Sequence, residues 1–156
     1  MKEQTPEFLV SACLCGLPCR YDGKSKPVED VRRLWEEGRA LPFCPEQAGG
    51  LKIPREPSEI QNGDGADVLS GRAKVLSRSG EDVTEHYLKG ARLALQACKK
   101  MGICKAVLKS KSPSCGCYTI HDGSFTDAMR PGMGVTAALL AKEGIRVCSE
   151  EDDYEG

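Results

Sequence analysis

The sequence predicts an α/β protein with a mostly parallel, Rossmann-like sheet that carries helices on both faces. Short apolar runs rich in β-branched residues alternate with amphipathic segments, and this alternation is typical of parallel sheets. The chain has 156 residues, of which 40% are hydrophobic and 29% charged, as in an ordinary globular protein. That length suits one domain, so we expect residues 1–156 to form a single unit.

Five apolar runs are each too short for a helix and are expected to form buried strands. They are residues 8–14, 41–44, 73–76, 103–108 and 145–148.

Three segments between these runs have helical patterns. Residues 28–38 place four apolar side chains on one helical face and end at a glycine. A longer helix is expected to begin near residues 82–86, and a third spans residues 133–143. Residues 45–72 are rich in glycine and proline and are expected to cross the surface as a long, functional loop. The acidic residues 149–156 are expected to fray as a tail.

The charge balance argues against a membrane or nucleic-acid partner. Lys and Arg number 22 against 23 Asp and Glu, so the net charge is −1 and gives little electrostatic affinity for nucleic acid. No apolar run approaches the roughly 20 residues that span a bilayer, and the N-terminus lacks the apolar core of a secretory signal. We therefore expect a cytoplasmic protein; the sequence does not specify its oligomeric state.

The chain contains nine cysteines, an odd number, and no export signal, so a disulfide framework is not expected. Cys13, Cys44 and Cys115 lie at or just after the ends of expected strands. Because ligands bind at the carboxyl edge of an open α/β sheet, these three thiols are expected to converge there.

Three thiolates suit either a zinc ion or an iron–sulfur cluster. A cubane cluster held by three cysteines leaves one iron open as a Lewis acid, as in an open catalytic zinc site. The spacing alone is also compatible with cysteines that pack as small apolar side chains. In particular, the closely spaced Cys13, Cys15 and Cys19 match no ordinary zinc-finger pattern.

Eight short blocks in this chain resemble, in order and over nearly the whole length, the thiouracil desulfurase family. The blocks are VSACL (10–14), PCRYDG (18–23), CPEQAGGL (44–51), IPREPSEI (53–60), DVTE (82–85), SPSCG (112–116), DGSF (122–125) and GVTAALL (134–140).

The resemblance implies a 4Fe–4S cluster bound by Cys13, Cys44 and Cys115, whose fourth iron captures the sulfur of a thiolated pyrimidine. It also implies Glu46 as the catalytic acidic residue and Ser112 as the catalytic serine. The implied reaction is the non-redox hydrolysis of thiouracil to uracil and hydrogen sulfide. A carboxylate two residues from a cluster ligand is placed to move protons, and Ser112 to orient water or the pyrimidine.

Simpler interpretations of these residues stay open. Glu46 could cap loop amides and Ser112 could be a turn hydroxyl. Cys15 and Cys117 depart from the family pattern and are expected to pack, whereas Cys19 belongs to a shared block and its role is open.

Four basic residues near the expected site favour a solvated rim, although a nucleotide substrate would use them as a phosphate clamp. They are Arg20, Arg55, Lys109 and Lys111. Two alternative functions follow: desulfuration of 4-thiouridine in a nucleotide or tRNA, and a non-catalytic domain that binds zinc or senses redox state through its thiols.

Overall fold

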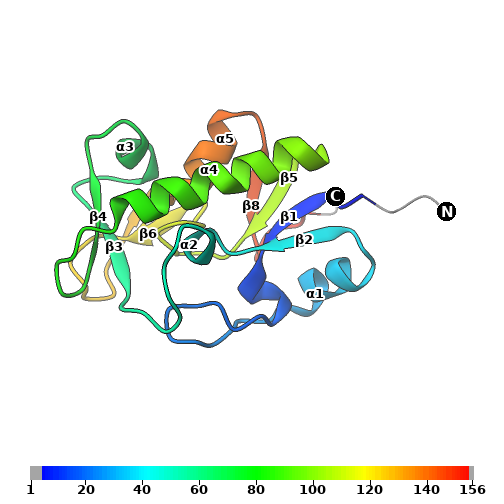
Figure 1. Ribbon diagram of the computed structural model, residues 1–156, viewed down its shortest axis with the longest axis horizontal. Helices are drawn as coiled ribbons and strands as arrows, with labels where there is room; N and C mark the ends of the chain where they lie inside the picture. The colour runs from blue at the N-terminus through cyan, green and yellow to red at the C-terminus, as the bar shows by residue number, and fades with distance from the viewer. Residues whose placement is uncertain (1–4, 155–156) are drawn as a thin grey trace.

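A four-stranded parallel sheet forms the centre of the protein, whose computed structural model describes residues 5–154 (Figure 1). Its strand order is β2-β1-β5-β8, and every neighbouring pair is parallel. The expected mostly parallel α/β architecture is therefore confirmed. The strands are β1 (Phe8–Ser11), β2 (Ala40–Phe43), β5 (Lys105–Leu108) and β8 (Arg146–Ser149).

Helices cover both faces of this sheet. On one face, α1 (Glu29–Glu36) buries Val31 and Leu34 against Phe8 and Val10 of β1. Successive residues of a strand point to opposite faces, so the intervening Leu9 belongs to the other core.

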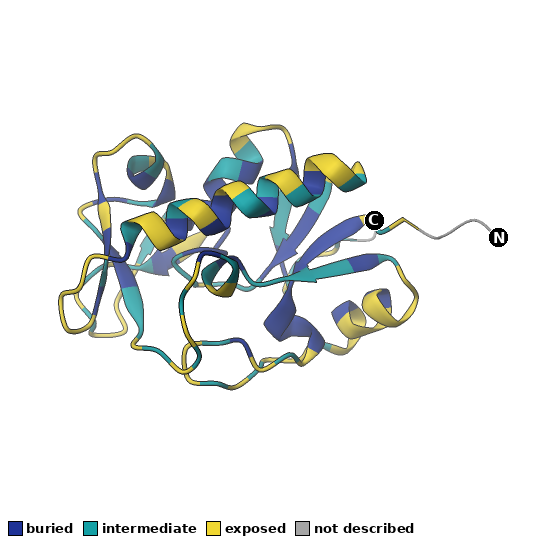
Figure 2. Cartoon of the chain, in the orientation of Figure 1, coloured by how far each residue is buried: buried dark blue, intermediate teal, exposed yellow. Residues whose placement is uncertain are grey.

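The opposite face packs against α4 (Thr84–Met101) and α5 (Val135–Lys142), which also contact each other (Figure 1). Cys98 of α4 and Leu140 of α5 are fully buried in this second core, whereas α4 exposes other residues along its length (Figure 2). Among residues 5–154, no helix is both long and apolar enough to cross a bilayer.

The expected strand at residues 73–76 forms, but outside the parallel sheet. It is β4 (Lys74–Ser77), which pairs antiparallel with β3 (Ser58–Gln61) in a separate two-stranded sheet. Ile60 and Val75 lie opposite each other in this pair and share a third core with α4. An apolar run indicates that a strand is buried but not which strand it pairs with. The partner, β3, lies in a segment of mixed polarity that carries no strand pattern.

The expected loop at residues 45–72 is more ordered than the sequence indicated, because it contains β3 and two short helices. These are α2 (Pro45–Ala48) and α3 (Gly65–Leu69). The Asp64 and Asp67 side chains cap α3 by accepting each other's backbone amide hydrogens.

Three further features differ from the sequence-based expectation. The run at residues 8–14 is split, because β1 ends at Ser11 and a 3₁₀ turn, Ala12–Cys15, follows it. A hairpin of β6 (Thr119–His121) and β7 (Met129–Pro131) was not anticipated. The acidic C-terminal segment packs on the domain as far as residue 154: Ser149 ends β8, and the Glu150 carboxylate accepts hydrogen bonds from the backbone and side chain of Ser110. Residues 155 and 156 lie outside the described range.

Candidate active site

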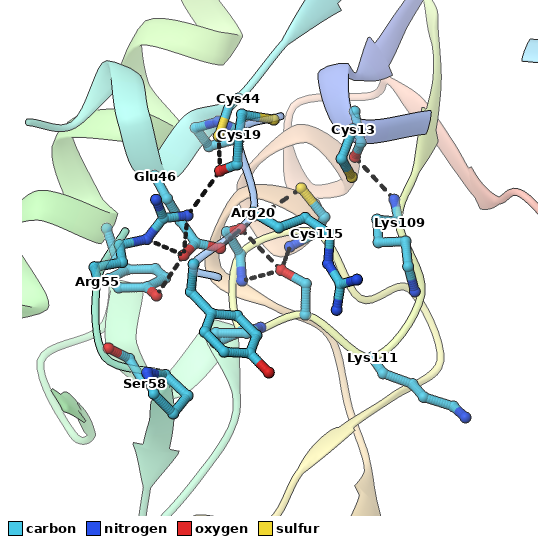
Figure 3. Close-up of a pocket in the computed structure, with 18 of the residues that line it drawn as sticks. Cys13, Cys19, Arg20, Cys44, Glu46, Arg55, Ser58, Lys109, Lys111 and Cys115 are labelled. Carbon is cyan, nitrogen blue, oxygen red and sulfur yellow. Dashed lines mark hydrogen bonds and ion pairs between the residues drawn. The ribbon is translucent and has the colours of Figure 1, made fainter. Parts of the chain in front are cut away.

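A cavity of about 330 Å³ opens at the carboxyl ends of the central strands, and Cys13, Cys44 and Cys115 all line it (Figure 3). The structure thus brings together the three thiols that the sequence singled out. Glu46 and Ser112 line the same cavity.

Each thiol follows a different strand of the parallel sheet. Cys13 lies in the 3₁₀ turn that follows β1, and Cys44 lies between β2 and α2. Cys115 lies in the loop that follows β5, a loop held by the start of α5. The backbone amides of Thr136 and Ala137 both donate to the carbonyl of Ser114, which fixes the position of Cys115 beside it.

A fourth thiol, that of Cys19, joins this group. Cys19 is only 5% exposed and lines the cavity, and its carbonyl oxygen accepts a hydrogen bond from the Cys44 thiol, whose Sγ lies 3.7 Å away. Its carbonyl accepts a hydrogen bond from Arg55. The sequence left the role of Cys19 open; the structure places it directly beside two expected cluster ligands.

The surroundings keep the thiols of Cys19, Cys44 and Cys115 protonated in the metal-free protein. Burial raises the pKa of Cys115 to about 12, and the contact with Cys13 raises the pKa of Cys19 to about 11. The pKa of Cys44 is raised as well, mainly by its interaction with the Cys19 thiol and next by burial. A metal centre bound here would have to displace those protons.

The donor set of the cavity is chemically suited to an iron–sulfur cluster. Within residues 5–154, no three His, Cys, Asp or Glu side chains are grouped closely enough to hold one metal ion. The thiols instead lie around a space of about 330 Å³, and cysteine thiolates are the ligands of iron–sulfur clusters. A hydrogen-bond donor lies beside one of the sulfurs as well, because the Gln47 backbone amide is 3.5 Å from Cys44 Sγ.

Glu46 is held by hydrogen bonds on both carboxylate oxygens. Its Oε1 accepts from Arg55 Nη2 at 3.0 Å and Nε at 3.2 Å, and from the Tyr87 hydroxyl at 2.9 Å. Its Oε2 accepts from the Ser114 hydroxyl at 2.9 Å. Burial, and next the Glu46 charge, raise the pKa of Tyr87 well above its usual value, so Tyr87 stays a neutral donor.

Ser112 connects to Glu46 through Ser114. The Ser112 Oγ accepts hydrogen bonds from the amides of Ser114 and Cys115, and it lies 3.0 Å from Ser114 Oγ. Since Ser114 donates its single hydroxyl proton to Glu46, the proton between the two serines comes from Ser112. Ser112, Ser114 and Glu46 therefore form one directed chain of hydrogen bonds.

Two glycines bring α2, and with it Glu46, against α4. A Cβ atom on Gly49 would collide with the carbonyl of His86, and one on Gly90 would collide with the carbonyl of Pro45. Only glycine permits this close approach, which places Tyr87 of α4 beside Glu46.

The basic residues do not form one solvated rim. The Arg55 side chain is only 10% exposed and forms an ion pair with Glu46. The Glu46 carboxylate is itself largely removed from solvent, so it needs a positive charge beside it. Lys109 lies 3.4 Å from the Glu150 carboxylate. Arg20 and Lys111 line the cavity mouth, and neither pairs with a carboxylate in the described part of the chain.

Sequence reasoning missed several cavity residues. Ser114 and Tyr87 carried no signal beyond their motif and helix, and Arg78 was not considered although it lines the cavity. Cys15 and Cys117 are buried in two different cores, away from the cavity lining.

The fold and site together define an α/β protein with a cysteine-lined cavity at the carboxyl edge of its sheet. The model of the 2-thiouracil desulfurase family matches residues 8–152, and the chain belongs to that family.

Two known proteins are similar to this chain. The chain is 48% identical over 145 residues to the uncharacterized protein YbbK of Bacillus subtilis (strain 168), covering 93% of this chain and 96% of YbbK. Its structure resembles that of TudS, described as a 4Fe–4S-dependent thiouracil desulfidase. The TM-score is 0.84 at 46% identity, covering 94% of this chain and 91% of the TudS chain.

Proposed function

We propose that this protein is an iron–sulfur enzyme that hydrolyses thiouracil to uracil and hydrogen sulfide. The observation that carries the proposal is that three thiols from three strand ends share one cavity with a hydrogen-bonded carboxylate, Glu46. Membership of the 2-thiouracil desulfurase family and the similarity to TudS support the substrate class and the cofactor.

Cys13, Cys44 and Cys115 would hold a 4Fe–4S cluster, leaving one iron without a protein ligand. When bound, the cluster supplies a soft Lewis acid that polarises the thiocarbonyl bond of the substrate. The overall reaction exchanges the C=S sulfur for a water oxygen, so it needs no electron donor or acceptor.

Glu46 moves the protons of this exchange. Its carboxylate takes a proton from the attacking water and returns it to the departing sulfur or the ring. Arg55 and Tyr87 occupy Oε1, which leaves Oε2 as the oxygen that exchanges protons through Ser114.

Ser112 orients the water or the pyrimidine at the cavity side of the same chain. Its Oγ is held by two backbone amides, so its position is set before substrate binds. A proton can pass from Ser112 through Ser114 to Glu46 without movement of the backbone.

The test is anaerobic purification followed by iron and sulfide analysis and a thiouracil turnover assay. We expect about four irons per chain and release of sulfide with uracil in equal amounts. Replacing Cys13, Cys44 or Cys115 by serine should abolish both cluster and turnover, whereas Cys104→Ser, at an exposed thiol, should keep both. One zinc per chain with no sulfide release would support the alternative of a non-catalytic zinc-binding domain instead.

A second candidate substrate is a nucleotide that carries 4-thiouracil. The observation that favours it is a set of cations at the cavity, Arg20, Arg78 and Lys111, none of which pairs with a carboxylate among residues 5–154. A free base does not need a phosphate clamp, but a nucleotide does. The test compares kcat/KM for free thiouracil, a 4-thiouridine monophosphate and thiolated tRNA at two salt concentrations. The highest kcat/KM identifies the preferred substrate among these three.

A further inference from the structure

Cys19 is a buried thiol that the proposed reaction does not use. It lines the same cavity as Cys13 and Cys44, two of the three residues expected to bind the cluster (Figure 3). The Cys44 thiol donates a hydrogen bond to the Cys19 carbonyl oxygen, with Cys44 Sγ 3.7 Å from that oxygen.

The segment that carries Cys19 is fixed at this position. Arg55 Nη2 donates to the Cys19 carbonyl at 3.1 Å, and the same guanidinium binds Glu46. The Arg55 amide also donates to the carbonyl of Tyr21. Cys19 is therefore held against Cys44 by the groups that shape the active site.

We propose that Cys19 and Cys44 form a disulfide when the cluster is absent, and that this disulfide closes the site to a new cluster until it is reduced. Cys44 is the expected partner because it is partly exposed and reachable by an oxidant, whereas Cys13 is buried, with 7% of its surface exposed. The inference rests on the proposed function only in that Cys44 is taken to be a cluster ligand.

The oxidant is a small-molecule disulfide. One protein thiol loses its proton and attacks the disulfide as the thiolate, which forms a mixed disulfide and releases one small thiolate that takes up the proton. The second protein thiol then attacks the mixed disulfide and releases the other small thiol. Two protein thiols are oxidised, one small disulfide is reduced to two thiols, and the two protons leave with the products.

Bound cluster prevents this reaction because the Cys44 sulfur is then occupied by iron. The disulfide in turn removes one ligand from the cluster site and leaves Cys13 and Cys115 as free thiols. Reduction by a dithiol restores the original set of thiols.

The test compares the full chain with and without cluster after treatment with oxidised glutathione. Remaining thiols are alkylated and tryptic peptides are analysed by mass. The expected product joins the peptide of residues 3–20 to that of residues 40–52, and it forms only in the cluster-free protein.

Residues 3–20 contain three cysteines, so variants assign the linked thiol. The link should disappear in Cys19→Ser and persist in Cys13→Ser and in Cys15→Ser. Cys15 is the matched control, since it is buried nearby without lining the cavity. Cluster uptake by the oxidised protein should fail and recover after reduction.

Absence of the link, or its persistence in Cys19→Ser, would overturn the inference, as would equal formation of the link in the cluster-loaded protein. A chain that binds no cluster and releases no sulfide, yet forms the Cys19–Cys44 link, would overturn the proposed function and leave this disulfide standing.

Discussion

The hydroxyl of Ser114 donates a hydrogen bond of 2.9 Å to Oε2 of Glu46, across 68 residues of sequence. This bond joins the loop that carries Cys115 to the helix that follows Cys44. Since Ser112 contacts Ser114 at 3.0 Å, the bond also completes the path from Ser112 to the carboxylate. The geometry of the proposed proton path thus depends on Ser114, which lies between Ser112 and Glu46, the two catalytic residues that the sequence indicated.

We expect Ser114→Ala to lower kcat about 10–100-fold, because a hydrogen bond to a charged group contributes about 1.5–3 kcal/mol. Ser114 is 1% exposed, so alanine fits but leaves Glu46 Oε2 without its donor. The measurement is steady-state turnover of thiouracil together with iron content, which should be unchanged.

Ser70→Ala is the control for this variant, because Ser70 lies in an exposed turn far from the cavity lining. If Ser114→Ala kept full kcat with a complete cluster, the path through Ser114 would be wrong.

Glu46→Gln is expected to reduce turnover by about 10²–10⁴-fold, the range usual for loss of a general acid–base group. The amide has nearly the same shape but cannot take up a proton at Oε2. Iron content should match that of the unsubstituted protein, and Glu85→Gln, on an exposed turn of α4, should have no effect. Loss of cluster in Glu46→Gln would assign Glu46 to cluster binding and not to proton transfer.

Arg55→Met should lower the free energy of unfolding of the cluster-free chain by about 3–5 kcal/mol, because it leaves a buried carboxylate without its cation. The side chains of Arg55 and Glu46 are 10% and 15% exposed. Arg32→Met is the matched control: its ion pair with Glu36 is well exposed and is expected to contribute only about 0–1 kcal/mol. Urea denaturation measures the free energy of unfolding of both variants. Equal decreases would show that the Arg55–Glu46 pair stabilises the protein no more than an exposed ion pair does.

The convergence of Cys13, Cys44 and Cys115 was predictable because each follows an apolar strand of the parallel sheet. Parallel strands present their carboxyl ends at one edge of the sheet, so a residue that directly follows such a strand is expected at that edge. β3 was not predictable in this way, since Ser58–Gln61 has only one aliphatic residue, Ile60, to mark it.

The partners of Glu46 could not be predicted from local patterns. Tyr87 lies 41 residues away and reaches Glu46 only because Gly49 and Gly90 let two helix backbones approach closely. Arg55 carries a charge that usually marks the surface, and only the position of Glu46 explains why it is buried. Contacts of this kind depend on packing between elements, which a single sequence does not specify.

The buried thiol of Cys98 in α4 should make the stability of the cluster-free protein fall in alkaline solution. Burial, and next the neighbouring Cys104, raise the pKa of Cys98 from 9.0 to about 11. In this range the unfolded chain releases the thiol proton while the folded chain keeps it, so unfolding becomes more favourable as pH rises. This contribution is fully present below about pH 9 and is lost toward pH 11. The expected slope for this one proton is about 1.4 kcal/mol per pH unit.

Cys98→Ala should therefore flatten the dependence of unfolding free energy on pH between 9 and 11, measured by urea denaturation at several pH values. Ala91→Gly serves as control, because Ala91 is buried in the same helix and carries no proton that titrates. It should lower stability by about 1 kcal/mol at every pH and keep the slope. Parallel curves for Cys98→Ala and the unsubstituted protein would show that Cys98 ionises alike in the folded and unfolded chains.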